Sequence, residues 1–435
     1  MRFTRSVLHL ASPWPGCAPY RVSRYGCPRR RAQQGDRHGM AKTHRLTRFA
    51  KPDILRSIDP ELLVELLGPH AAWAESSGLS LTRPHELDYD RLSLLLIGAH
   101  GEVPSSLLDL VCLIDDMSSN QMEDQIRGLA ARLGVAISEE DVNADIAVRL
   151  ALHDANALAD LHVEGLSYRF RTTDRIAALC KEVPRPRKVT PQVKSHLEDV
   201  LNGDFERRGR DRTAVVYPIE TEGGFRLLIS RGDTLKRQSV IEEGQRRTRL
   251  FRPEEFDLVC YDQKRGDLLV KVKGVTDRRV YCQAIGLCLF GDRFMFDPDL
   301  SPSRYSLAPF RERGRAALTF AHIPGIEGAW IERLEVKRRD YDNGVIKIYA
   351  PNVWELLELF GRPVPDAAVF FRAALKFKLA GLKRERTLVL TPPFRCSCEQ
   401  DDHGEIIEQF MDSGGYLLPR SESMREIPPS LFDGA

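Results

Sequence analysis

Apolar residues between positions 53 and 165 recur every three or four positions, the spacing that places them on one face of a helix. Asp59 and Pro60 form a helix start, in which an N-cap residue precedes a proline in the first turn. Residues 138–141 have the form of a capping box ahead of a later helix. The pattern predicts a small helical domain whose amphipathic helices bury one another's apolar faces.

The spacing of apolar residues changes to every second position from about residue 212. Residues 213–218 and 225–230 flank Gly223 and Gly224, an arrangement that predicts a hairpin. Two further strands are predicted at 256–260 and 268–272, with a turn between them. A helical pattern follows at 279–290 and ends at Gly291.

The C-terminal third alternates in the same way. Strands are predicted on either side of the turn Asp342-Asn343-Gly344, and again at 375–379 and 388–390. Helices are predicted at 352–360 and near 404–411. Consecutive strands joined by short turns favour antiparallel sheet over parallel βαβ units.

We therefore predict an α+β fold, with a helical N-terminal domain followed by antiparallel-sheet modules with covering helices. The predicted parts are a disordered leader or mis-assigned start at 1–40, a helical domain at 41–170, a linker at 171–205, an antiparallel β-rich domain with a closing helix at 206–300, an α+β module at 301–415 and a tail at 416–435. The leader has eight arginines, no lysine and a single acid, Asp36, so Met40 is a plausible alternative start.

Overall composition excludes several classes of protein. The 435 residues include 64 Lys and Arg against 62 Asp and Glu, so no global charge directs the chain to a polyanion. No run approaches the roughly 18 apolar residues of a membrane helix. The nine cysteines are odd in number and several lie in apolar patterns, which favours free thiols in a reducing cytoplasm over a disulfide scaffold.

One pair of predicted strands resembles the nucleases of the PD-(D/E)xK class. Those enzymes carry an Asp on one strand and an acid-x-Lys on the next, because two carboxylates hold the metal that activates water. Asp257 and Lys273 match that layout, but Lys271 stands where the second carboxylate belongs, and Asp267 lies four positions earlier. The alternative is a half-exposed strand whose lysines are solvated.

Metal-ligand patterns are weak elsewhere. His153-Asp154 resembles part of the ligand set of metal-dependent phosphohydrolases, but a helical surface pair is the simpler interpretation. Cys396, Cys398 and His403 supply three zinc ligands where a structural site uses four. We predict neither a metal nor a cofactor. Nucleophile elbows, phosphate-binding loops and metalloprotease motifs are absent from the sequence.

Positive charge is concentrated between residues 205 and 252, which contain twelve cations and seven acids. Arginine predominates, and its guanidinium suits bidentate contact with phosphate or carboxylate. The candidate anion-binding residues are Arg207, Arg208, Arg210, Arg246, Arg247 and Arg249. We expect the last three to occupy a loop that could follow a phosphate backbone. The alternative is that these cations are solvated or paired with the interspersed acids.

The stretch from about 46 to 411 resembles a family of uncharacterised bacterial proteins, through the segments Arg48-Phe-Ala-Lys-Pro52, Phe251-Arg-Pro-Glu-Glu255 and Leu289-Phe-Gly-Asp292. The resemblance implies a bacterial, cytoplasmic setting and assigns no residue roles. The function predicted from the residues is a non-catalytic interaction protein whose basic face binds nucleic acid or an acidic protein. The alternative is a degenerate metal-dependent nuclease that uses Asp257 and Lys273.

Overall fold

The computed structural model describes the greater part of the chain. The described residues are 46, 48–49, 51–98, 103–168, 170, 172–221, 223–242, 244–338, 344–361, 368–382, 384–398 and 402–420. The predicted leader at 1–40 and most of the predicted tail lie outside them.

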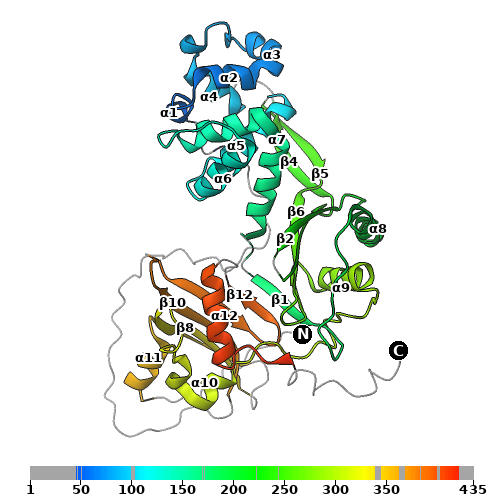
Figure 1. The fold of residues 1–435 in the computed structure, drawn as a ribbon, viewed down its shortest axis with the longest axis vertical. Helices are drawn as coiled ribbons and strands as arrows, with labels where there is room; N and C mark the ends of the chain where they lie inside the picture. The colour runs from blue at the N-terminus through cyan, green and yellow to red at the C-terminus, as the bar shows by residue number, and fades with distance from the viewer. Residues whose placement is uncertain are drawn as a thin grey trace, which may run out of the picture. The chain divides into compact units, whose positions relative to one another are not determined.

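The N-terminal part of the described chain is helical, as predicted (Figure 1). Its elements are α1 (Pro52–Leu55), α2 (Pro60–Leu67), η1 (Gly68–His70), α3 (Ala71–Ser76), η2 (Pro84–Glu86), α4 (Tyr89–Leu96), α5 (Ser105–Met117), α6 (Glu123–Leu133) and α7 (Asn143–Tyr168). Asp59 caps α2 by accepting a hydrogen bond from the backbone N–H of Glu61 at 2.9 Å. Gly134 ends α6 in the left-handed conformation, at φ 71°.

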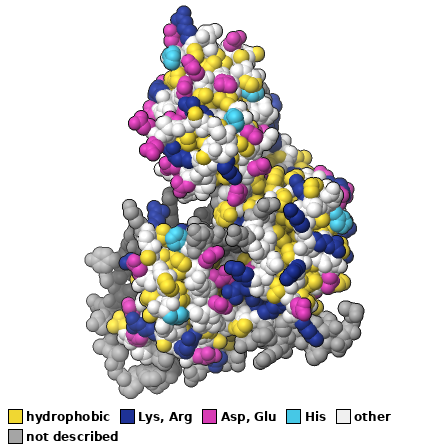
Figure 2. Space-filling view, viewed as in Figure 1, with side chains coloured by type: hydrophobic (Ala, Val, Ile, Leu, Met, Phe, Trp, Pro, Cys, Tyr) yellow, Lys and Arg dark blue, Asp and Glu magenta, His cyan; other side chains and the backbone are white. Residues whose placement is uncertain are grey.

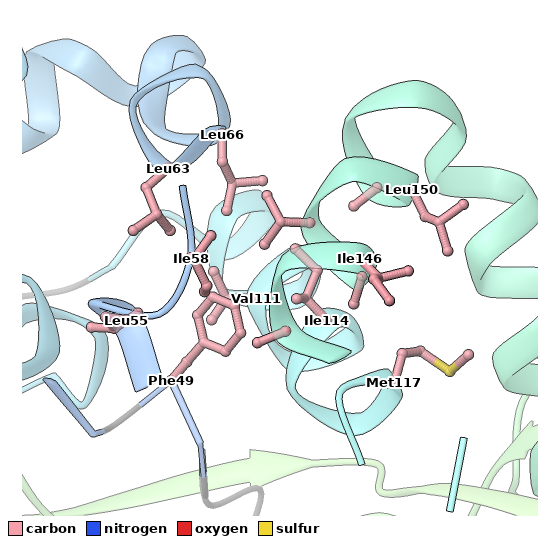
Figure 3. Close-up of a cluster of buried hydrophobic side chains, with 14 of the residues drawn as sticks. Phe49, Leu55, Ile58, Leu63, Leu66, Val111, Ile114, Met117, Ile146 and Leu150 are labelled. Carbon is pink, nitrogen blue, oxygen red and sulfur yellow. The ribbon is translucent and has the colours of Figure 1, made fainter. Parts of the chain in front are cut away.

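The apolar faces of these helices meet in one core (Figure 3). Phe49, Ile114 and Ile146 are fully buried there, although they lie far apart in the sequence. The buried carboxylate of Asp115 anchors the start of the segment, because it accepts hydrogen bonds from the backbone N–H groups of Arg48 and Phe49. Phe49 thereby becomes a core residue of the helical part.

Helix α7 is interrupted at Asp154, whose backbone has φ −154° and ψ 91°. The Asp154 side chain accepts hydrogen bonds from the N–H groups of Asn156 and Ala157, both at 3.0 Å. This is the geometry of an N-cap, so α7 consists of two helices that meet at Asp154.

Ten of the described strands form one antiparallel sheet in the order β2-β3-β6-β7-β1-β12-β11-β10-β8-β9. The strands are β1 (Thr172–Ala177), β2 (Val215–Thr221), β3 (Gly224–Gly232), β6 (Glu254–Asp262), β7 (Asp267–Lys271), β8 (Ile326–Arg338), β9 (Val345–Tyr349), β10 (Ala368–Leu379), β11 (Arg386–Thr391) and β12 (Arg395–Ser397). The chain enters this sheet at β1, which pairs with β7 on one side and with β12 on the other. The predicted α+β fold is confirmed.

Each half of the sheet has its own core. The half that contains β2, β3, β6 and β7 packs against α8 (Pro191–Arg207) and α9 (Val275–Ile285), which lie on the same face (Figure 1). Helix α9 continues into the π-helical turn η3 (Gly286–Phe290). The other half packs against α10 (Ala308–Arg313), η4 (Gly314–Leu318), α11 (Val353–Leu359) and α12 (Asp402–Ser413).

The opposite face of the first half is covered by a smaller cluster. Leu228, Leu258 and Cys260 are buried there against Val163 and Leu166 of α7. The strands of this half are therefore apolar on both faces, which is why β3 and β6 are almost continuously buried.

Two strands lie outside the large sheet. β4 (Lys236–Glu242) and β5 (Gln245–Phe251) pair antiparallel with each other around a turn at Gly244, and the described chain pairs them with no other strand. Every residue of β5 is exposed. Among the described helices, none has the combination of length and apolar composition that crossing a lipid bilayer requires.

Candidate nucleic-acid interface

The carboxylate of Asp257 is buried in β6 and is paired with a cation. It accepts hydrogen bonds from Arg231 Nε at 2.6 Å and from the Tyr281 hydroxyl at 2.9 Å. The Arg231 side chain is itself fully buried. Burial raises the pKa of the Asp257 carboxyl above its ordinary value, and the Arg231 guanidinium opposes that rise. The contacts of Asp257 are those of a buried, neutralised ion pair.

The strand register separates Asp257 from Lys271. Leu258 lies opposite Lys271 in the β6–β7 ladder, so these two side chains share one face of the sheet. Asp257 precedes Leu258 and points to the other face. Lys271 Nζ lies 4.9 Å from the centre of the Phe170 ring. An acid at position 271 would therefore face away from Asp257.

Lys273 contacts two other carboxylates. Its Nζ lies 3.0 Å from Asp233 Oδ2 and 3.2 Å from Glu255 Oε1. Lys236 Nζ lies 3.5 Å from the same Asp233 oxygen. Burial alone would raise the pKa of Asp233, but hydrogen bonds from Thr234 and Lys273 lower it to about 2.

A further buried carboxylate, that of Asp277, contacts arginines. Arg231 Nη2 lies 3.7 Å from Asp277 Oδ2, and Arg210 Nη1 lies 2.8 Å from Asp277 Oδ1. Asp257 and Asp277 are thus bridged by the Arg231 guanidinium. Within the described ranges, no group of three or more His, Cys, Asp or Glu side chains is placed to hold a metal ion.

The other candidate metal ligands occupy structural positions. Asp154 caps the second half of α7, as described above. Cys396 is buried in β12, and burial raises the pKa of its thiol to about 12, which disfavours the thiolate that a metal requires. Cys398 is partly exposed just beyond that strand. His403 lies in the first turn of α12.

The first three predicted anion-binding arginines form intramolecular ion pairs. Arg207 Nη2 lies 2.5 Å from Asp204 Oδ1, one turn earlier in α8. Arg208 and Arg210 both contact Asp277. For these residues the contacts support the alternative that the cations are paired with acids.

The last three predicted arginines lie on a different element from the first three. Arg246, Arg247 and Arg249 lie in strand β5, so the loop expected there is wrong. The strand has no apolar face and therefore lacks the alternating pattern that marks a half-buried strand. Arg246 Nη2 lies 3.5 Å from the Ser239 hydroxyl on the paired strand. The sequence indicates these cations as a candidate site but does not predict the hairpin that carries them.

We call the hairpin Lys236–Phe251 the basic ribbon. Its sequence carries five cations and two acids, Glu242 and Glu243. Elsewhere, Lys and Arg side chains are interspersed with Asp and Glu over the visible face of the molecule (Figure 2). The ribbon is thus a local concentration of positive charge.

Comparison of the chain with protein-family models and with curated proteins finds no match to either. Function must therefore be inferred from geometry and charge.

Proposed function

We propose that this protein is a non-catalytic binding protein whose basic ribbon binds nucleic acid. The observation that carries the proposal is that two paired strands outside the main sheet hold four exposed arginines, Arg237, Arg246, Arg247 and Arg249. An isolated two-stranded hairpin gains little stability from its own packing. An exposed strand pair with this composition is therefore better suited to contact with a partner than to support of the fold.

The cations of the basic ribbon suit a polyanion. They are Lys236, Arg237, Arg246, Arg247 and Arg249. Four of the five are arginines, whose planar guanidinium donates paired hydrogen bonds to phosphate oxygens. A ribbon presents side chains on both faces, so its cations can reach phosphates on either side of an inserted strand pair.

The helical part of the chain has the opposite character. Residues 51–168 include twenty-one acids and seven cations. Acidic side chains are spread over these helices in Figure 2. Such a surface repels nucleic acid, which favours the basic ribbon as the binding element. The helical part also offers positions for control substitutions that are far from the ribbon in sequence.

A non-catalytic role is supported by the partners of the candidate nuclease residues. Asp257 is bonded to Arg231 and Tyr281, whereas Lys273 is bonded to Asp233 and Glu255. The alternative, a degenerate nuclease, requires a second carboxylate beside Asp257 to hold a metal ion, with Lys273 near the water that the metal activates. The seven described cysteines are free thiols, in keeping with a cytoplasmic site of action.

The test is the binding of fluorescently labelled nucleic acid at several salt concentrations. We expect wild-type affinity on the order of micromolar at physiological salt, falling steeply as salt increases. Replacing Arg246, Arg247 and Arg249 together with Ala should weaken binding and flatten the salt dependence by up to about three phosphate contacts. The melting temperature should barely change, because exposed charges contribute little to stability.

The control variant removes the same charge elsewhere. Arg56, Arg83 and Arg279 are exposed and each forms an ion pair outside the basic ribbon. Replacing all three with Ala should leave binding nearly unchanged. Equal losses in both triple variants would show that net charge, and not the ribbon, controls binding. No binding to DNA or RNA at low salt would overturn the proposal.

A further inference from the structure

The two faces of the basic ribbon differ in chemistry. Directly opposed residues of a hairpin share a face, so the β4–β5 register assigns each side chain. One face consists of Arg237, Ser239, Ile241, Arg246, Thr248 and Leu250. We call it the isoleucine face. It has no acid and is exposed throughout, with Ile241 at 81% and Leu250 at 63% exposure.

The other face has a different composition. Its members are Lys236, Gln238, Val240, Glu242, Gln245, Arg247, Arg249 and Phe251. It carries three of the five cations, Lys236, Arg247 and Arg249. Both faces carry two apolar side chains, but those of the isoleucine face are the more exposed, since Phe251 is 36% exposed and Val240 is partly buried.

The isoleucine face combines three kinds of group that match the edges of base pairs in the major groove. Its two arginines can donate to guanine O6 and N7. Its hydroxyls, on Ser239 and Thr248, can donate or accept hydrogen bonds. Ile241 and Leu250 can contact thymine methyl groups, which would remove these exposed apolar side chains from water.

The dimensions of the ribbon agree with those of the major groove of B-form DNA. Paired strands lie about 4.8 Å apart, and seven residues extend roughly 23 Å. The major groove of B-form DNA is about 12 Å wide and admits a two-stranded ribbon. The corresponding groove of A-form RNA is deep and too narrow for side chains to read. The same ribbon thus distinguishes the two duplexes by shape.

We propose that the basic ribbon inserts its isoleucine face into the major groove of B-form DNA. This inference rests on the proposed nucleic-acid-binding function and specifies its ligand as duplex DNA. Contact with base edges is made by the isoleucine face. Arg247 and Arg249 start from the opposite face, and their long side chains can bend back to the phosphates at the groove rim.

The first experiment compares three labelled probes of one mixed sequence with the full chain: duplex DNA of about 20 base pairs, duplex RNA of equal length, and single-stranded DNA. We expect duplex DNA to bind about tenfold more tightly than either of the others. Methyl green, which occupies the major groove, should displace the protein, whereas the minor-groove ligand netropsin should not. Equal affinity for duplex RNA, or displacement by netropsin alone, would overturn groove insertion.

The second experiment separates the two faces. The double variant Ile241→Ser with Leu250→Ser should weaken binding to duplex DNA by about tenfold without changing the salt dependence, because no charge is lost. The matched control, Val240→Ser with Phe251→Ser, changes apolar side chains of the other face and should have little effect. Equal losses in both variants, with unchanged melting temperatures, would overturn the assignment of faces.

These outcomes distinguish the inference from the function on which it rests. Salt-dependent binding without preference for duplex DNA would retain nucleic-acid binding by the ribbon and reject groove insertion. Absence of binding to all three probes would reject both.

Discussion

Asp257 lies in β6 and Lys273 lies two residues beyond the end of β7, and each is hydrogen-bonded to other partners. Arg231 and Tyr281 satisfy the buried Asp257, and Asp233 and Glu255 satisfy Lys273. The spacing of the Asp, the second acid and the Lys in the PD-(D/E)xK motif does not say which residues these side chains contact in the folded protein. Arg231 comes from β3 and Tyr281 from α9, so the pairing depends on tertiary packing that a linear motif cannot contain.

Asp233 gives a pH-dependent prediction at this scale. Its pKa is about 2 in the folded protein, below the ordinary value of 3.8, because hydrogen bonds to the ionised form outweigh its burial. Asp233 therefore stabilises the fold above its ordinary pKa, and this contribution is lost as the pH falls through about 2. We expect Asp233→Asn to cost about 1 to 2 kcal/mol at pH 6 and much less near pH 2.

Urea unfolding of the wild type and the Asp233→Asn variant at pH 6, 4 and 3 measures this difference. The gap between the two unfolding free energies should narrow as the pH falls. A constant gap over this interval would mean that the carboxylate does not titrate with a lowered pKa.

At the scale of single elements, helices and strands are predicted best where apolar residues recur at the helical or the strand period. The hairpin at Gly223 and Gly224 and the helix α11 are confirmed, because an apolar face and local turn signals agree there. β1 lies within the span 171–205 that the sequence predicts as a linker. Its Asp174 and Arg175 are buried charged residues, and buried ion pairs look like loop residues in a sequence.

The basic ribbon was missed for the opposite reason. β5 is exposed on both faces, Lys236 and Val240 of β4 are partly buried, and neither strand has apolar periodicity. The arginines could be proposed as a candidate site from composition, but their division between two faces follows from the register alone. Register is set by backbone pairing and the turn at Gly244. The location of the candidate site was thus partly predictable, and its geometry was not.

The interruption of α7 gives a prediction at the element scale. Asp154→Ala removes the acceptor of two backbone N–H groups at the start of the second helix. We expect a loss of about 1 kcal/mol in the free energy of unfolding, and Asp154→Asn should retain most of the stability. Asp160→Ala, at an exposed position of the same helix, is the matched control and should change stability by less than about 0.5 kcal/mol. Equal stability of the two Ala variants in urea unfolding would refute the capping role.

At the scale of the whole sheet, β1 joins two halves that have separate cores. Hydrogen bonds run from β1 to β7 and to β12, and both of its charged residues are part of buried networks. Asp174 accepts from Arg278 Nη1 at 2.7 Å and from Arg395 Nε at 2.7 Å. One of these arginines comes from α9 and the other from β12, so a single carboxylate joins both halves.

Arg175 has the same role on the other face of β1. Its guanidinium lies 3.2 Å from Asp267 Oδ2, 3.1 Å from Asp262 Oδ2 and 2.7 Å from Glu408 Oε1. Asp262 and Asp267 belong to the first half of the sheet, whereas Glu408 belongs to α12. Burial opposes the charge of Arg175, but the surrounding carboxylates raise its pKa well above the ordinary value. The cation therefore stays charged at every accessible pH.

Replacing Arg175 with Met should therefore destabilise the protein by about 3 kcal/mol or more. The fully buried carboxylate of Asp267 would lose one of its positively charged partners. Arg265→Met is the matched control: Arg265 also contacts Asp262 and Glu408, but it is partly exposed and should cost less than about 1 kcal/mol. Urea unfolding followed by tryptophan fluorescence and by circular dichroism compares the two variants. We expect the Arg175 variant to unfold at lower urea concentration than the wild type. If the two halves of the sheet then unfold independently, the single unfolding transition should split into two. A loss no larger than that of the Arg265 variant, with a single unchanged transition, would show that backbone pairing alone joins the halves.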